Sequence, residues 1–222
     1  ALRHGGARLS PWALAPLALA ILVAAYIWGA VGILIGLTAT VLVAVLGRLA
    51  LAISPGTRDS LWWDIAGSAF VLVYIGVLGA SVVVLGQQQR GQWWVLGAII
   101  VVVTVDVSAY AVGRALGRHK LAPAISPGKT WEGFAGAALA AALAGGLVGV
   151  FLLEVSLVWG LAIGVVLLLT ATGGDLFESW IKRALGIKDM SSLLPGHGGI
   201  LDRVDSALPS VAVTLLLYHL LA

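Results

Sequence analysis

Residues 11–53 read PWALAPLALAILVAAYIWGAVGILIGLTATVLVAVLGRLALAI, and this apolar run decides the fold class. A helix of about 20 apolar residues crosses a bilayer whose hydrocarbon core is about 30 Å thick. The run is too long for one such helix, and the best place for a break is Trp28-Gly29. It therefore predicts two successive membrane spans, over residues 11–29 and 31–53.

The rest of the sequence is also rich in apolar residues. It is 60% hydrophobic and 10% charged, whereas soluble domains have about 25% charged residues. The fold class is therefore all-α, a polytopic integral membrane helical bundle of about seven transmembrane helices. One transmembrane domain over residues 1–222 is expected, with N-terminal spans in 1–105, a catalytic half in 106–206 and a last span in 207–222. The further spans are predicted over residues 65–85, 92–115, 133–153, 157–185 and 206–222.

Basic residues give the orientation. With these spans, all thirteen Lys and Arg except Arg90 fall on the side of the N-terminus and of the loops near 54–64, 116–131 and 186–205. The positive-inside rule makes that side cytoplasmic and the C-terminus external, in a cell (inner) membrane. Tryptophans at the span ends are expected to be interfacial anchors: Trp12, Trp28, Trp62, Trp63, Trp93, Trp94 and Trp159.

Pairs of small residues recur at four-residue spacing, as in Gly145/Gly149 and Gly160/Gly164. Such pairs let helices approach closely. Packing within the chain is favoured, and contact between two copies in a homodimer is the alternative. The chain has no cysteine, which excludes disulfides, thiolate metal sites and cysteine nucleophiles.

Asp106 lies inside the fourth predicted span. An ionisable residue at such a position is costly and is functional by default. Asp106, Tyr110 and Gly113 share one helical face, so the acid and the hydroxyl are expected to look into the bundle. A structural hydrogen bond to a neighbouring helix is the alternative.

The loop over 116–131 combines basic residues with Ser126-Pro-Gly-Lys-Thr130. These groups can hold anions, either lipid headgroups or nucleotide phosphates. A solvated loop that only sets the topology is the alternative. The run Lys129-Thr-Trp-Glu-Gly133 favours binding, because no topology signal requires that mixture of charge, hydroxyl and aromatic ring.

The sixth span ends with TGGDLFESWIKRALG, residues 172–186. Helical spacing places Asp175, Glu178, Ser179 and Lys182 on one face. Glu178 and Lys182 could simply form an ion pair, whereas Asp175 has no basic residue one turn before it. Asp175 is therefore expected to be a metal or substrate ligand.

A glycine turn, PGHGG over residues 195–199, precedes LDRVDS over 201–206. Asp202 and Asp205 stand where the last helix would begin, and its dipole favours anions there. Capping is the alternative for either acid, and His197 could be an ordinary loop residue. Because oxygen ligands dominate, the expected metal is Mg²⁺.

The run from Ser179 to Asp205, SWIKRALGIKDMSSLLPGHGGILDRVD, resembles the signature of the CDP-diacylglycerol synthases, or phosphatidate cytidylyltransferases. The stretches Asp106–Arg114 and Ser126–Gly133 are similar to a second conserved region of that family. The resemblance covers about the C-terminal half of the chain.

This resemblance implies transfer of CMP from CTP to phosphatidic acid, with release of pyrophosphate. The expected partners are CTP, phosphatidic acid and membrane lipid, without nucleic acid. It also implies that Asp175 and Asp202 hold the metal, and that Lys182 and Arg203 take part in catalysis at the phosphates. The expected substrate-binding residues are Ser126, Lys129, Thr130, Ser179, Arg183, Lys188, His197, Gly198, Gly199, Asp205 and Asp106.

Two other functions stay open. The first is a CTP-dependent transferase or kinase acting on another lipid, because nothing in the signature reads acyl chains. The second is a cation transporter that uses Asp106 and Asp175 as ligands. The crowding of polar residues on the predicted cytoplasmic side counts against a transport path open to both faces.

Overall fold

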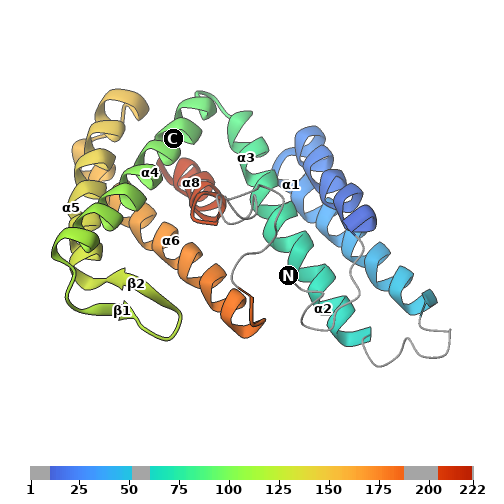
Figure 1. The fold of residues 1–222 in the computed structure, drawn as a ribbon. Coiled ribbons are helices and arrows are strands. Elements are labelled where there is room, and N and C mark those ends of the chain that lie inside the picture. The colour runs from blue at the N-terminus through green and yellow to red at the C-terminus, as the bar shows by residue number, and fades with distance from the viewer. Residues whose placement is uncertain (1–10, 52–60, 188–204, 222) are drawn as a thin grey trace. The chain divides into compact units, whose positions relative to one another are not determined.

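The structure is a computed structural model that describes residues 11–51, 61–187 and 205–221 (Figure 1). Nearly all of these residues are helical, which confirms the predicted fold class. The chain divides into two compact units, Ala1–Gln87 and Gln88–Ala222. The expectation of one transmembrane domain stays a prediction.

The first unit opens with α1, Pro11–Leu51, whose course is broken at Gly29 (φ 62°, ψ −140°). The two limbs of α1 fold back on each other, because a Cβ added at Gly36 would lie 3.0 Å from Cα of Ile21. Glycine adopts this backbone conformation without a steric penalty. The predicted break at Trp28-Gly29 is confirmed.

The first unit continues with α2 (Leu61–Val71), the π-helical segment η1 (Leu72–Val77) and α3 (Leu78–Gly86). Arg48 near the end of α1 forms an ion pair with the buried Asp64 of α2, at 3.6 Å. The fully buried Ile21 packs against Gly76 of η1, where an added Cβ would meet its Cδ1 at 2.5 Å. The first limb of α1 therefore packs against the helical stretch formed by α2, η1 and α3.

The second unit is a bundle of α4 (Gly91–Leu116), α5 (Trp131–Val148), α6 (Leu157–Ala184) and α8 (Ala207–Leu221), with the π-helical segment η2 (Gly149–Leu153) after α5. Helices α5 and α6 pack through glycine, since a Cβ at Gly145 would lie 2.5 Å from Cα of Gly164. The expected close packing of small residues within the chain is confirmed.

A small antiparallel hairpin joins α4 to α5 (Figure 1). Its strands are β1 (Lys120–Ala122) and β2 (Ser126–Thr130), and Lys120 pairs with Thr130 and Ala122 with Ser126. Strand β2 contacts α4, α5 and α6. The hairpin therefore places the predicted anion-binding loop against three helices.

The end of the bundle away from the hairpin has its own polar contacts. Arg90, before α4, forms an ion pair with Glu154 and donates to the carbonyl of Leu152 at 3.1 Å. Tyr218 of α8 donates to the carbonyl of Gln89 at 3.3 Å. These bonds tie the start of α4 to the α5–α6 connection and to the C-terminal part of α8.

Five helical stretches in the described residues are long and apolar enough to cross a membrane: Trp12–Ala50, Leu61–Gly86, Gly91–Leu116, Trp131–Leu153 and Leu157–Ala184. The apolar helix Ala207–Leu221 is shorter. The chain is a multi-pass membrane protein, and the count of seven spans stays a prediction.

The prediction of an interfacial anchor is wrong for one tryptophan, Trp94. Trp94 is 3% exposed and packs edge-on against the ring of Tyr218 at 5.4 Å between centroids. Its neighbour Trp93 is 40% exposed. Adjacent positions on a helix face different directions, so the Trp-Trp pair has one ring in the core and one on the surface.

Candidate active site

The hairpin and α6 meet through a direct ion pair. Lys129 Nζ of β2 lies 2.7 Å from Asp175 Oδ2 of α6. Ser179, one turn further along α6, donates to Asp175 Oδ1 at 3.3 Å. The side chains of Lys129 and Asp175 are 24% and 35% exposed. The pair is thus partly shielded yet open to a ligand, and it brings together three of the predicted site residues.

The second acid of the same face lies deeper. Glu178 is 1% exposed and accepts a bond from Lys182 Nζ at 3.1 Å. This is the intrahelical ion pair that the sequence left as an alternative. Lys182 is therefore held at a buried carboxyl group, while its own side chain is 18% exposed.

Asp205, in the turn just before α8, joins this group. Its side chain hydrogen-bonds with that of Glu178, and its Oδ1 accepts from the backbone N–H of Ser206 at 2.8 Å. Burial raises the pKa of the Asp205 carboxyl, the bond with Glu178 lowers it, and the negative charge of Asp175 raises it, with a net upward shift. A hydrogen bond between two carboxyl groups requires a proton on one of them.

Close backbone packing brings α8 to this position. A Cβ at Gly174 would lie 2.5 Å from the carbonyl oxygen of Asp205 and 3.1 Å from Cγ of Pro209. Only glycine allows that approach. Gly174 therefore sets the distance between the start of α8 and the acids of α6.

Asp106 contributes from α4. Its Oδ2 accepts from Ser206 Oγ at 3.1 Å. This is the interhelical hydrogen bond that the sequence offered as an alternative, and it also brings Asp106 close enough to Asp175, Asp205 and Lys129 for electrostatic interaction. The expectation that Tyr110 looks into the bundle is wrong: the residue is 66% exposed, and its hydroxyl accepts from Arg114 at 2.7 Å. One turn of α4 carries the two side chains to different surroundings.

The hairpin is fixed at its tip and at its base. Arg183 Nε of α6 donates to the carbonyl of Ile125, in the turn of the hairpin, at 3.3 Å. Thr130 is buried, and its Oγ1 accepts from the backbone N–H of Gly133 at 3.1 Å as the N-cap of α5. The Thr130 hydroxyl, predicted to bind substrate, already has this structural partner. Ser126 lies at the start of β2, partly buried.

The remaining predicted site residues lie outside the described residues. These are the metal ligand Asp202, the catalytic Arg203, and the substrate-binding Lys188, His197, Gly198 and Gly199. Within the described ranges, no three or more His, Cys, Asp or Glu side chains form a group arranged to hold a metal ion. Asp175 is the described residue to which the sequence assigns a metal.

Sequence reasoning gave no individual role to three residues of this region. Glu132 accepts bonds from the chain entering β1, His119 bonds with it, and Ser206 bonds with Asp106. The mixture of charged, hydroxyl and aromatic residues over Lys129–Gly133 could have pointed to Glu132. Nothing in the sequence marks His119 or Ser206, because their roles depend on which helices are neighbours.

The described residues thus bring anionic and cationic groups from four elements to one end of the bundle. Asp106, Asp175 and Asp205 offer oxygen atoms, which hard divalent cations prefer. Lys129, Lys182 and Arg183 offer donors for phosphate oxygens. These are the kinds of side chain that bind divalent cations and phosphate groups, although the described acids do not by themselves form a metal-holding group.

Comparison with known proteins agrees with this chemistry. The sequence profile of the cytidylyltransferase family matches residues 4–221. A protein of Mycobacterium bovis named phosphatidate cytidylyltransferase is 38% identical over 205 residues, 87% of this chain and 66% of that protein. A Mycobacterium tuberculosis protein of the same name is 38% identical, with 87% of this chain and 62% of that protein covered. The Brucella abortus protein of that name is 46% identical over 158 residues, 70% of this chain and 56% of that protein.

The chain therefore spans less than two thirds of the length of these relatives. The match of the family profile nevertheless covers almost all of the chain. The resemblance predicted from the signature over residues 179–205 is confirmed. The chain belongs to the cytidylyltransferase family.

Proposed function

We propose that this protein transfers CMP from CTP to phosphatidic acid, giving CDP-diacylglycerol and pyrophosphate. The observation that carries the proposal is the contact between Lys129 and Asp175, at 2.7 Å. This contact supports the proposal, because it joins a cation that would bind phosphate to a carboxylate that would hold a metal. The relatives named phosphatidate cytidylyltransferase supply the substrate class.

The reaction needs no nucleophile from the protein. A phosphate oxygen of phosphatidic acid attacks the α-phosphorus of CTP, forming a new P–O bond, while the bond to the bridging oxygen breaks and pyrophosphate leaves. Lys129, Lys182 and Arg183 bind phosphate oxygens and offset the negative charge that grows on the leaving group. Positioned charges of this kind contribute most of the rate in such reactions.

The chemistry of Asp175 and its surroundings suits a hard cation such as Mg²⁺. Asp175 has a carboxylate that is 35% exposed, with a hydroxyl from Ser179 beside it, and the chain has no cysteine to attract softer metals. Asp175 and Asp202 would hold the ion. When bound, it supplies further positive charge for the triphosphate. Lys129 pairs with Asp175 in the structure, so its ammonium group would lie beside a phosphate bound at the metal.

The site would face the cytoplasm at the surface of the inner membrane. In the second unit, the described Lys and Arg residues lie at the hairpin end of the bundle, apart from Arg90. The positive-inside rule makes the hairpin end cytoplasmic. That position suits both substrates, since CTP is soluble and phosphatidic acid lies in the leaflet.

The test follows pyrophosphate release from CTP by purified protein in lipid nanodiscs with Mg²⁺. Phosphatidic acid is compared with diacylglycerol and with an isoprenoid alcohol as acceptor. Turnover with phosphatidic acid alone, lost in Asp202→Ala, supports the proposal. Turnover with another acceptor and not with phosphatidic acid would remove the substrate assignment, and full activity of Asp202→Ala would remove the metal assignment.

A further inference from the structure

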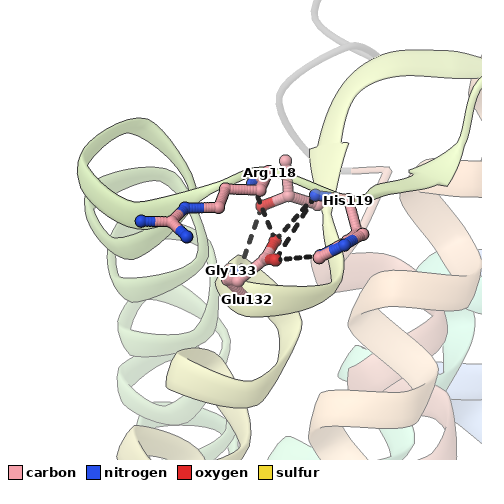
Figure 2. A network of polar contacts seen from close by, with 5 residues as sticks. Arg118, His119, Glu132 and Gly133 are labelled. Atoms are coloured by element: carbon pink, nitrogen blue, oxygen red, sulfur yellow. Dashed lines mark hydrogen bonds and ion pairs between the residues drawn. The ribbon is translucent and has the colours of Figure 1, made fainter.

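Glu132 is an acidic residue near the site that the reaction does not use, and its carboxylate has several donors. The backbone N–H of Arg118 donates to Oε2 at 3.1 Å, and that of His119 donates to the same oxygen at 3.2 Å. Nδ1 of His119 lies 2.6 Å from Oε1. Figure 2 shows the carboxylate facing His119 and the chain at Arg118.

These bonds serve the hairpin and not the helix that carries Glu132. The N-cap of α5 is Thr130, which already accepts from Gly133. Glu132 instead holds the two residues that lead into β1. The bond from the N–H of Trp131 to the carbonyl of His119, at 3.0 Å, closes the same junction. The base of the hairpin is therefore hydrogen-bonded to the start of α5.

The hairpin requires contacts of this kind to be stable. It has strands of three and five residues with an irregular register between Lys120 and Ala122. An isolated two-stranded hairpin is marginally stable at best in water. Lys129 stands three residues before Glu132. The contacts of Glu132 at the base of the hairpin therefore set the position of the Lys129 ammonium group relative to Asp175.

We infer that Glu132 is a positioning residue, which fixes the base of the β1–β2 hairpin and thereby holds Lys129 at Asp175 for binding of the CTP phosphates. The inference rests on the proposed function for the identity of the ligand. The position of Lys129 relative to α6 can be measured without that ligand.

The first experiment is a double-mutant cycle on CTP binding, measured by calorimetry in nanodiscs with Mg²⁺. Glu132→Gln places an amide N–H₂ among donors and removes the charge. We expect about tenfold weaker binding, the scale for losing hydrogen bonds to a charged group. In a Lys129→Met background the same change should have little further effect, because Glu132 acts through Lys129. Equal losses in both backgrounds, or no loss in either, would overturn the inference.

The matched control is Glu154→Gln. Glu154 is also a carboxylate at an end of the bundle, paired with Arg90 away from the hairpin. Its substitution should leave CTP binding unchanged. His119→Ala removes one donor to Glu132 from a side chain that is 77% exposed, so the protein should still fold, and we expect a smaller loss in the same direction.

The second experiment needs no ligand. Because the chain has no cysteine, spin labels can be placed at Gly128→Cys on the hairpin and Gly173→Cys on α6, where an added Cβ meets nothing within 4 Å. Electron–electron distance measurements should give one narrow distribution, which broadens when Glu132→Gln is added. A distribution that stays narrow and unshifted would overturn the inference. If wild-type protein fails to bind CTP, the proposed function fails, and this measurement still decides the role of Glu132.

Discussion

Asp205 is the residue at which burial and charge conflict most directly. It is 9% exposed, bonds with the buried Glu178 and lies in the field of Asp175. A carboxylate with these neighbours is harder to ionise than one in water. Ionised Asp205 therefore costs folding stability at neutral pH.

This cost predicts a pH dependence of stability. Because burial raises the pKa of Asp205 in the folded state, the folded protein binds this proton more tightly than the unfolded chain does. Raising the pH from below the ordinary aspartate value to above the raised one therefore removes stability from the wild type. The variant Asp205→Asn keeps a side-chain oxygen that can accept from the backbone N–H of Ser206. Its amide does not titrate, so it lacks this pH dependence.

The measurement is thermal unfolding in detergent, followed by tryptophan fluorescence from about pH 4 to pH 7. The unfolding temperature of Asp205→Asn minus that of the wild type should increase with pH. A difference that stays constant or decreases across this range would show that Asp205 is not held with a raised pKa.

The side chains on one helix could be related from the sequence alone. Helical spacing put Asp175, Ser179, Glu178 and Lys182 on one face, and the structure bonds them in pairs at that spacing. The partner of Asp175 could not be found in this way, because Lys129 reaches it from a different element. Tyr110 was misplaced for a related reason: the face it shares with Asp106 is only partly covered by neighbouring helices.

At the scale of elements, adjacent glycines of α6 have opposite roles. An added Cβ at Gly174 would strike the backbone of Asp205, whereas one at Gly173 meets nothing within 4 Å. Gly174 therefore fixes the packing of α8 on α6, and Gly173 does not.

Gly174→Ala should destabilise the protein by about 1–3 kcal/mol, the usual cost of overpacking. It should also lower catalytic activity, because it moves Asp205 and Ser206 away from α6 and α4. Gly173→Ala is the matched control and should be neutral or stabilising by up to about 1 kcal/mol, since alanine favours helix. Equal stability of the two variants would contradict the packing described here.

The break in α1 gives a second prediction for an element. Gly29 has φ 62° and ψ −140°, a conformation that costs other residues of order 1–3 kcal/mol. Gly29→Ala should lower the unfolding temperature although no neighbour lies within 4 Å of the added Cβ. Gly47→Ala, equally open and without positive φ, should not. Similar melting of both variants would mean that the chain does not turn at Gly29.

Apolar runs and a glycine break were enough to predict the helices and the turn within α1. The hairpin could not be predicted, because its strands are short and β2, SPGKT, lacks the alternation of apolar and polar residues that marks a strand. Its structure depends on contacts with α4, α5 and α6, which no local pattern specifies.

At the scale of the whole molecule, the proposal requires the hairpin end of the second unit to face the cytoplasm. The α3–α4 connection with Arg90 lies at the other end of α4 from the hairpin. The two ends of this helix should therefore be reachable from opposite sides of the membrane.

Single cysteines test this in the cysteine-free chain. Gly128→Cys on the hairpin should react with a membrane-impermeant thiol reagent only in inside-out vesicles, and Gln89→Cys, which is exposed, only in right-side-out vesicles. The reverse pattern would place the site outside, where CTP is not available. Labelling of both positions from one side would contradict α4 as a membrane span.

The most direct test of the central claim is formation of CDP-diacylglycerol from radiolabelled CTP and phosphatidic acid by wild-type and Asp175→Asn protein. We expect product from the wild type and a rate at least about 100-fold lower for the variant, as for loss of a charge-stabilising group, with unchanged unfolding temperature. An Asp175→Asn variant that makes product within a few-fold of the wild-type rate would contradict the assignment of the site to Asp175 and Lys129.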